Sequence, residues 1–102
     1  MTPVEILKDA RELISVPERW TQGANARTKK GMPIGSAEHN AVCWCALGAI
    51  GKNSLPSSTE KLEAICFLVR QIDVAVSAFN DEHTHPEVVA LFDRAIAAAE
   101  AQ

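Results

Sequence analysis

The side chains of this chain that bind metal ions most readily are those of three cysteines and three histidines. His39 precedes Cys43 by four residues, a spacing that would place both side chains on one face of a helix. His83 and His85 could supply further ligands from a later loop. The cysteines nevertheless form no Cys-x-x-Cys pair of the kind that zinc sites commonly contain. Because free cysteine is common in protein interiors, the sequence favours buried core thiols over a metal site, and it predicts no cofactor.

The dipeptide Cys43-Trp44 is also a candidate for nucleophilic chemistry. It resembles the dipeptide at the start of the catalytic helix in papain-like and transglutaminase-like hydrolases, where the helix N-terminus lowers the thiol pKa. His83 or His85 would then be the general base. Cys43, however, lies about seven residues inside its expected helix, where the helix dipole contributes little. The sequence therefore favours a protein without enzymatic activity.

Basic residues gather between residues 17 and 35. Arg27, Lys29 and Lys30 lie on or beside an expected turn, with Trp20 nearby. They could contact phosphate groups or an acidic protein surface, or simply form a solvated face. Arg27 follows the small residues 23–26, so its guanidinium could instead fold inward and pair with Asp81.

A concave site for a small ligand or a substrate is the alternative to a macromolecular surface. Such a pocket would be bounded by Trp20, Arg27, Trp44 and Asp81. Asn80 adjoins it, but Asn80 and Asp81 are also natural turn and capping residues. A structural role for this pair is therefore expected.

Length and composition are those of an ordinary globular protein. The 102 residues are 47% apolar and 23% charged, which suits a single helical domain over residues 1–102. No apolar run reaches the roughly 20 residues that span a bilayer, and the N-terminus lacks a secretory pattern. We therefore expect a cytoplasmic protein with reduced cysteines and no membrane partner. The net charge of −3 argues against a general nucleic-acid binder.

Helix signals stand near both ends of the chain. Thr2 and Glu5 form a capping box for a first helix that ends before Pro17. Thr84 and Glu87 repeat this pattern for the last helix. The expected buried stripe of the last helix is Val88, Leu91, Phe92, Ala95, Ile96 and Ala99.

Two further helices are expected between these. The first runs from about residue 36 to 50. It carries Ala41, Cys45, Gly48 and Ala49 on one face, and this small-residue strip would let another backbone approach closely. The strip could therefore serve self-association into a homodimer.

The longest expected helix covers residues 57–79 and is taken as the central helix of the core. Ser57 and Glu60 form its capping box. Its apolar residues recur in steps of three and four, at Leu62, Ile65, Val69, Ile72, Val76 and Phe79. Residues 80–83 are expected to break the chain after it.

Strand signals are confined to one short region. Residues 24–27 and 32–34 could form two strands, with residues 28–31 as the turn and Gly31 in the left-handed conformation. The fold class is therefore mainly α (α+β): a compact single domain of about four helices, with one small β-hairpin between the first and second helices.

Three segments of the chain resemble a known family. They are Trp20-Thr21-Gln22-Gly23-Ala24 followed by Ala26-Arg27, then Cys43-Trp44-Cys45-Ala46-Leu47-Gly48-Ala49, then Phe79-Asn80-Asp81. Together they are similar to an uncharacterised family of small proteins from bacteria and their phages. The resemblance implies an accessory protein of prophage origin, and it carries over no catalytic residue.

These observations predict a small non-enzymatic binding or accessory protein that acts through a macromolecular partner, most simply another protein. Its expected contact surfaces are the small-residue strip and the basic hairpin. A small-ligand-binding protein or enzyme with the pocket described above is one alternative. A nucleic-acid accessory factor that uses Arg27, Lys29 and Lys30 is another.

Overall fold

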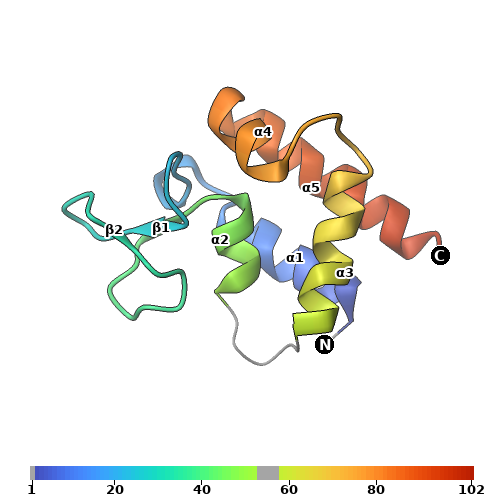
Figure 1. Ribbon diagram of the computed structural model, residues 1–102, viewed down its shortest axis with the longest axis horizontal. Helices are drawn as coiled ribbons and strands as arrows, with labels where there is room; N and C mark the ends of the chain where they lie inside the picture. Colours follow the sequence, from blue (N-terminus) through green and yellow to red (C-terminus); the bar gives the residue numbers. More distant parts are fainter. Residues whose placement is uncertain (1, 53–57) are drawn as a thin grey trace.

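Helices make up most of the computed structural model, which describes residues 2–52 and 58–102, and a small sheet projects from one end of them (Figure 1). The helices are α1 (Pro3–Leu13), the 3₁₀ helix η1 (Pro17–Arg19), α2 (Ala46–Gly51), α3 (Ser58–Val69), α4 (Val76–Glu82) and α5 (His85–Glu100). The strands are β1 (Ala26–Arg27), β2 (Pro33–Ile34) and β3 (Cys43–Trp44). The predicted mainly helical α+β domain is confirmed, with one α-helix and one strand more than expected.

The capping boxes predicted for the first and last helices are both present. The Thr2 hydroxyl accepts a hydrogen bond from the Glu5 backbone N–H at 3.2 Å, and the Glu5 carboxylate accepts one from the Thr2 N–H at 3.0 Å. Thr84 and Glu87 make the same reciprocal pair at the start of α5. Each pair satisfies N–H groups that a helix start leaves without intrahelical partners, so these two starts follow from residues three positions apart.

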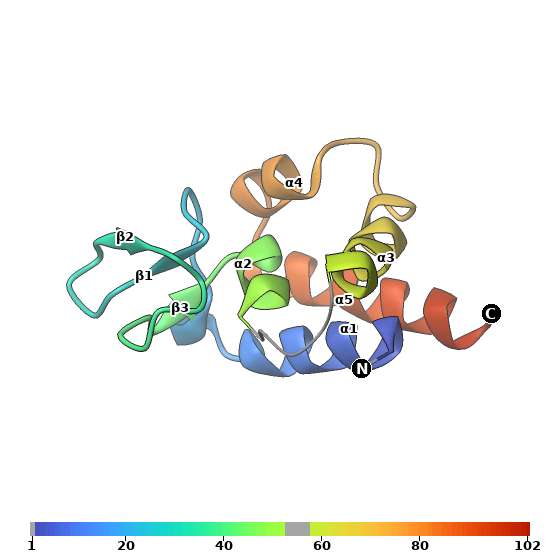
Figure 2. The ribbon, with the colours of Figure 1, turned by 60° about the horizontal axis from the view of Figure 1, so that its bottom comes forward.

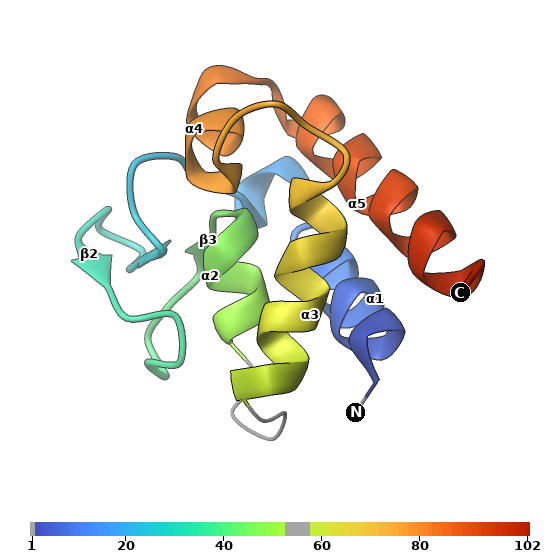
Figure 3. The ribbon, with the colours of Figure 1, turned by 45° about the vertical axis from the view of Figure 1, so that its right-hand side comes forward.

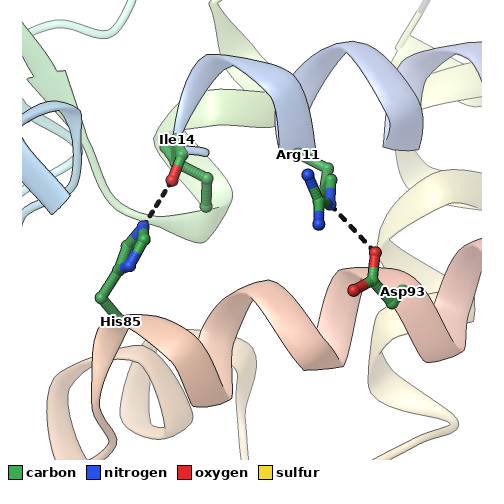
Figure 4. A network of polar contacts seen from close by, with 4 residues as sticks. All are labelled: Arg11, Ile14, His85 and Asp93. Carbon is green, nitrogen blue, oxygen red and sulfur yellow. Dashed lines mark hydrogen bonds and ion pairs between the residues drawn. The ribbon is translucent and has the colours of Figure 1, made fainter. Parts of the chain in front are cut away.

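The helices α1 and α5 lie side by side and run in opposite directions (Figure 2). Three polar contacts set this register: Lys8–Glu100, Arg11–Asp93 and Ile14–His85. The Arg11–Asp93 and Ile14–His85 contacts have lengths of 3.0 Å and 2.6 Å and are drawn as dashed lines in Figure 4. The pairing is antiparallel, so the start of α1 lies near the end of α5.

The core lies mainly between α1 and α5, with α2 and α3 packed against α1. Its largest fully buried side chains include Leu7, Ile14, Leu91 and Phe92. The expected stripe of α5 is confirmed as buried, apart from the half-buried Ile96. The prediction that the third helix is the central core helix is wrong. It covers the core from outside, buries only Ala64 and Leu68, and leaves the predicted core residues Leu62 and Val69 61% and 46% exposed.

The helix expected over residues 57–79 is two helices, and its expected cap Ser57 lies outside the described residues. α3 ends at Val69 and α4 begins at Val76. The connection contains Ile72, Asp73 and Val74, which are poorer helix formers than leucine or alanine. Apolar residues continue at helical spacing through the connection between α3 and α4, so their spacing alone could not reveal that the helix is interrupted there.

The turn lets α4 pack against α2 (Figure 1). A second correction follows for the expected break at residues 80–83. Asn80, Asp81 and Glu82 belong to α4, and the break is confined to His83 and the Thr84 cap. Asn80 is therefore held on a helix, where it is 1% exposed.

The predicted hairpin is confirmed, and Gly31 has the left-handed conformation that its turn requires, with φ +86°. A third strand extends it, so the antiparallel sheet has the order β2-β1-β3. Ala26 stands opposite Ile34 on one side and Trp44 on the other. Figure 2 shows this sheet standing away from the helices, at the opposite end from the C-terminus.

The helix expected from residue 36 to 50 is wrong in its first half. Cys43 and Trp44 form β3, and α2 begins only at Ala46. Backbone pairing decides this, because Val42 N–H donates to Arg27 O and Cys45 N–H donates to Asn25 O. The helical spacing of His39 and Cys43 therefore has no structural counterpart.

Gly48 confirms the predicted close approach of another backbone. A Cβ atom at this position would stand 1.8 Å from the carbonyl oxygen of Asn25. The small-residue strip consequently faces inward: Cys45 and Ala49 are 6% and 4% exposed. The strip packs within one chain, so it does not form the exposed surface for self-association that the sequence suggested.

Candidate functional site

Asn80 joins three segments that lie far apart in the sequence. Its Oδ1 accepts hydrogen bonds from Trp20 Nε1 at 2.8 Å and from the Ala46 backbone N–H at 3.0 Å. Its Nδ2 donates to Thr21 O at 3.0 Å and to Asp81 Oδ1 at 3.2 Å. An asparagine amide offers two acceptor and two donor positions, so all four are used here. We call this arrangement the Asn80 junction.

Gln22 and Gly23 close the junction over the end of α4. The Gln22 amide donates to the carbonyl oxygens of Asn80, Asp81 and His83 at 3.0–3.1 Å. These carbonyls lack intrahelical partners at a helix C-terminus, so Gln22 acts as a cap from a distant segment. Gly23, with φ +80°, donates its N–H to Asp81 Oδ1 at 3.0 Å.

A hollow of about 260 Å³ opens beside the junction. It is lined by Gly23, Ala24, Asn25, Cys45, Ser77 and Asp81. Its polar groups are a carboxylate, an amide and a hydroxyl, which together suit a small ligand that carries hydrogen-bond donors or a positive charge. The Asp81 carboxylate lines this hollow and is held in place at Oδ1 by Gly23 N–H and Asn80 Nδ2.

The thiol that borders the hollow is held in its neutral form. Burial raises the pKa of Cys45, and this outweighs the N–H groups of α2 that would stabilise a thiolate. Its sulfur caps α2 by accepting a hydrogen bond from Gly48 N–H at 3.3 Å. The thiol points to Asn25 Oδ1 at 3.8 Å. Cys45 is therefore a packing and capping residue with little nucleophilic character.

The histidines proposed as bases or ligands have structural partners. His83 Nδ1 bonds to Phe79 O at 2.9 Å, and its ring stacks on Phe79 at 3.8 Å between centroids. His85 Nε2 bonds to Ile14 O. His85 therefore ties the start of α5 to the end of α1, whereas the His83 ring contacts the last turns of α4.

The two candidate metal ligands, His39 and Cys43, do not share a helix. His39 lies exposed in the loop before β3, and Cys43 is half-buried on β3. Within residues 2–52 and 58–102, no three His, Cys, Asp or Glu side chains group together as a metal site requires. Cys66 is exposed on α3, so the prediction that all three thiols lie in the core is wrong for this one.

Arg27 folds inward as suggested, but its predicted pairing with Asp81 is wrong. Its guanidinium donates to Thr21 Oγ1, Gln22 O and Gly31 O at 3.0–3.1 Å. These acceptors are neutral and lie within six residues of Arg27. Arg27 therefore fastens the hairpin to the segment that leads into the junction.

The backbones of Trp20 and Trp44 lie next to each other and form an isolated parallel bridge. Trp44 is 5% exposed and donates from Nε1 to Ser36 O at 2.9 Å. Trp20 is half-buried, and the centroid of its ring lies 5.7 Å from the centroid of the His85 ring. Both therefore serve to hold the sheet on the helices.

The structure thus brings together Trp20, Asn80 and Asp81 from the predicted site, with Trp44 and Arg27 at its border. Lys29 and Lys30 lie elsewhere, exposed in the turn of the hairpin. Sequence reasoning missed Gln22, Asn25 and Ser77 as parts of the site. Gln22 belongs to one of the three segments that resemble the family. Its role could not be read from that segment, because it depends on contacts with residues about 60 positions away.

Segments from three parts of the chain meet at this junction: residues 20–25 approach α4, and α2 begins against Asn80. Residues 1–98 match the model of DUF6197, a family of unknown function. The chain belongs to this family. Comparisons of this DUF6197 member with curated proteins and with solved structures find no match. Within the part of the chain that the structure describes, no helix combines the length and the apolar character that crossing a bilayer requires.

Proposed function

We propose that this DUF6197 member is a small non-enzymatic binding protein that contacts an acidic surface of another protein through the tip of its hairpin. The observation that carries this proposal is the placement of Lys29 and Lys30. Both are exposed in the turn between β1 and β2, the part of the sheet farthest from the helices (Figure 1). Met32 beside them is 62% exposed, which adds an apolar contact to the two charges.

The hairpin is built to keep this tip in place. Arg27 ties the hairpin to Thr21 and Gln22, and Thr28 closes the turn through its own contacts with Gly31 and Met32. A surface that is ordered before binding loses less entropy when a partner arrives. The neutral Cys45 thiol and the structurally bonded histidines further support a binding role over a thiol-based enzyme.

The test variant carries glutamate at both Lys29 and Lys30. The partner is first captured by crosslinking in the source cells, and calorimetry with the purified pair then measures the binding affinity. The matched control is Lys52→Glu with Arg94→Glu, two exposed positions outside the hairpin that give the same change in net charge. Loss of binding in the hairpin variant alone supports the proposal. Equal binding by both variants refutes it.

Nucleic-acid binding through the same turn is tested in parallel. Fluorescence anisotropy with labelled single- and double-stranded oligonucleotides would show an affinity that falls steeply with salt if phosphate groups are the target. Such a result would replace the protein partner with a nucleic acid. The origin of the family in bacteria and their phages is part of our proposal and rests on the resemblance of the three recurring segments.

A second candidate function is small-ligand binding, and the hollow beside Asp81 favours it. Asp81, Asn25 and Ser77 would hold a small ammonium-bearing ligand. Titration with simple amines can be monitored by nuclear magnetic resonance. Binding should shift the backbone amide signals of residues 23–25, which line the hollow. The variant Ser77→Ala should weaken these shifts, because Ser77 contributes a hydroxyl to the lining. Unchanged spectra would remove this candidate.

A further inference from the structure

The helix α3 carries apolar residues on opposite sides. Its inner side buries Ala64 and Leu68 against the core. Its outer side presents Leu62, Cys66 and Val69, spaced by four and three residues. Leu62 is 61% exposed, Val69 is 46% exposed, and Cys66 is also exposed. These three residues form what we call the outer α3 face.

Nothing within the described residues covers this face. Figure 3 shows α3 on the near side of the molecule, with no other element drawn in front of it. A helix with apolar residues all round is typical of a buried helix. A row of exposed aliphatic residues at helical spacing is characteristic of a helix that packs against another helix.

Charged residues border the outer α3 face on one edge. At 100° per residue, Glu63 and Arg70 lie within about 20° of each other on the same side of the stripe. Seven residues separate them, which is roughly 10 Å along the helix axis. The Arg70 guanidinium lies 5.1 Å from the centre of the Phe67 ring, which keeps it on this edge.

Opposite charges on one edge make the face complementary to itself. When two identical helices pack antiparallel about a twofold axis, each edge meets the same edge of its partner. An axis passing near Cys66 brings Glu63 of one copy to Arg70 of the other, twice. It also brings Leu62 of one copy toward Val69 of the other, so the apolar residues face each other.

We propose that the protein forms a homodimer through the outer α3 face, with α3 of one copy antiparallel to α3 of the second. Cys66 lies at the centre of this interface, and two Glu63–Arg70 pairs flank it. The interface is distinct from the hairpin tip, so either proposal can fail without the other. The dimer presents two hairpins, which would strengthen binding to a repeated partner.

The first experiment is sedimentation velocity of the full chain over a wide concentration range. A dimer has twice the 11.0 kDa mass of the chain. Leu62→Glu should raise the dissociation constant at least about tenfold, because it places a charge opposite the apolar Val69 of the second copy. Met32→Glu is the matched control, since Met32 is equally exposed at 62% but lies on the hairpin. It should leave the dimer unchanged.

A charge exchange tests the antiparallel arrangement itself. Glu63→Arg alone should weaken the dimer, and adding Arg70→Glu should restore it, because the exchanged charges again meet opposite partners. A short bismaleimide should crosslink two chains through Cys66, and Cys66→Ser should abolish the product. A monomer at every concentration overturns the proposal. A dimer that is indifferent to Leu62→Glu and yields no Cys66 crosslink also overturns it.

Discussion

Replacing Gly48 with alanine tests the close approach of the Asn25 backbone to α2. The added Cβ would stand 1.8 Å from the Asn25 carbonyl oxygen and 2.7 Å from its carbonyl carbon. Both are backbone atoms, so relief requires a shift of the whole peptide group. That carbonyl also accepts a hydrogen bond from Cys45 N–H at 3.1 Å, and the shift would weaken this bond as well.

The magnitude follows from three opposing terms. Overpacking costs about 1–3 kcal/mol. Loss of the hydrogen bond costs about 1 kcal/mol, and alanine's greater helix propensity returns about 1 kcal/mol. The expected net loss in the free energy of unfolding is about 1–3 kcal/mol. For a domain of this size the melting temperature should fall by about 5–20 °C.

Urea and thermal denaturation followed by circular dichroism provide the assay. Gly35→Ala is the matched control, because its Cβ would meet nothing closer than Glu38 Cγ at 3.6 Å. The control should change stability by less than about 0.5 kcal/mol. If Gly48→Ala equals or exceeds the wild type in stability, helix propensity alone governs this position, and the inferred approach of Asn25 is refuted.

Four further predictions concern the junction, the hairpin, acid stability and the thiols. Asn80→Ala leaves the buried Ala46 N–H and the partly buried Trp20 Nε1–H and Thr21 carbonyl without this partner, so urea denaturation should show a loss of about 3–5 kcal/mol; a loss below about 1 kcal/mol would contradict the junction. Arg27→Ala should accelerate amide hydrogen exchange in the hairpin, because three hydrogen bonds disappear, and equal acceleration in α1 would contradict a local role. Hydrogen bonds from Thr84 lower the pKa of Glu87. Its contribution to stability is therefore present above the ordinary glutamate pKa and is lost as the pH falls through the lowered value. Acid titration of Glu87→Gln should show a smaller loss than the wild type, and identical curves would argue against the capping box. Ellman's reagent should modify the exposed Cys66 first and the buried Cys45 last; the opposite order would revive a reactive Cys45.

Local sequence determined the features that depend on neighbouring residues. The starts of α1 and α5 follow from Thr2 with Glu5 and from Thr84 with Glu87, because each capping box closes within one turn. The hairpin turn follows from Gly31, since its positive φ is costly for other residues.

Tertiary contacts decided the features whose partners are distant. Cys43 and Trp44 have a helix-compatible sequence, yet pairing with Arg27 and Ala26 makes them a strand. The same competition explains why Asn80, expected in a turn, is buried on α4: its three hydrogen bonds to other segments outweigh its turn preference.

The orientation of apolar faces shows the same division. The sequence by itself determined that residues 58–69 form a helix with abundant apolar side chains. It could not determine that Ala64 and Leu68 face the core while Leu62 and Val69 face outward, because apolar residues surround the helix and either side could have been buried. Packing against α1 and α5 decided which side was used, and it left the other side exposed.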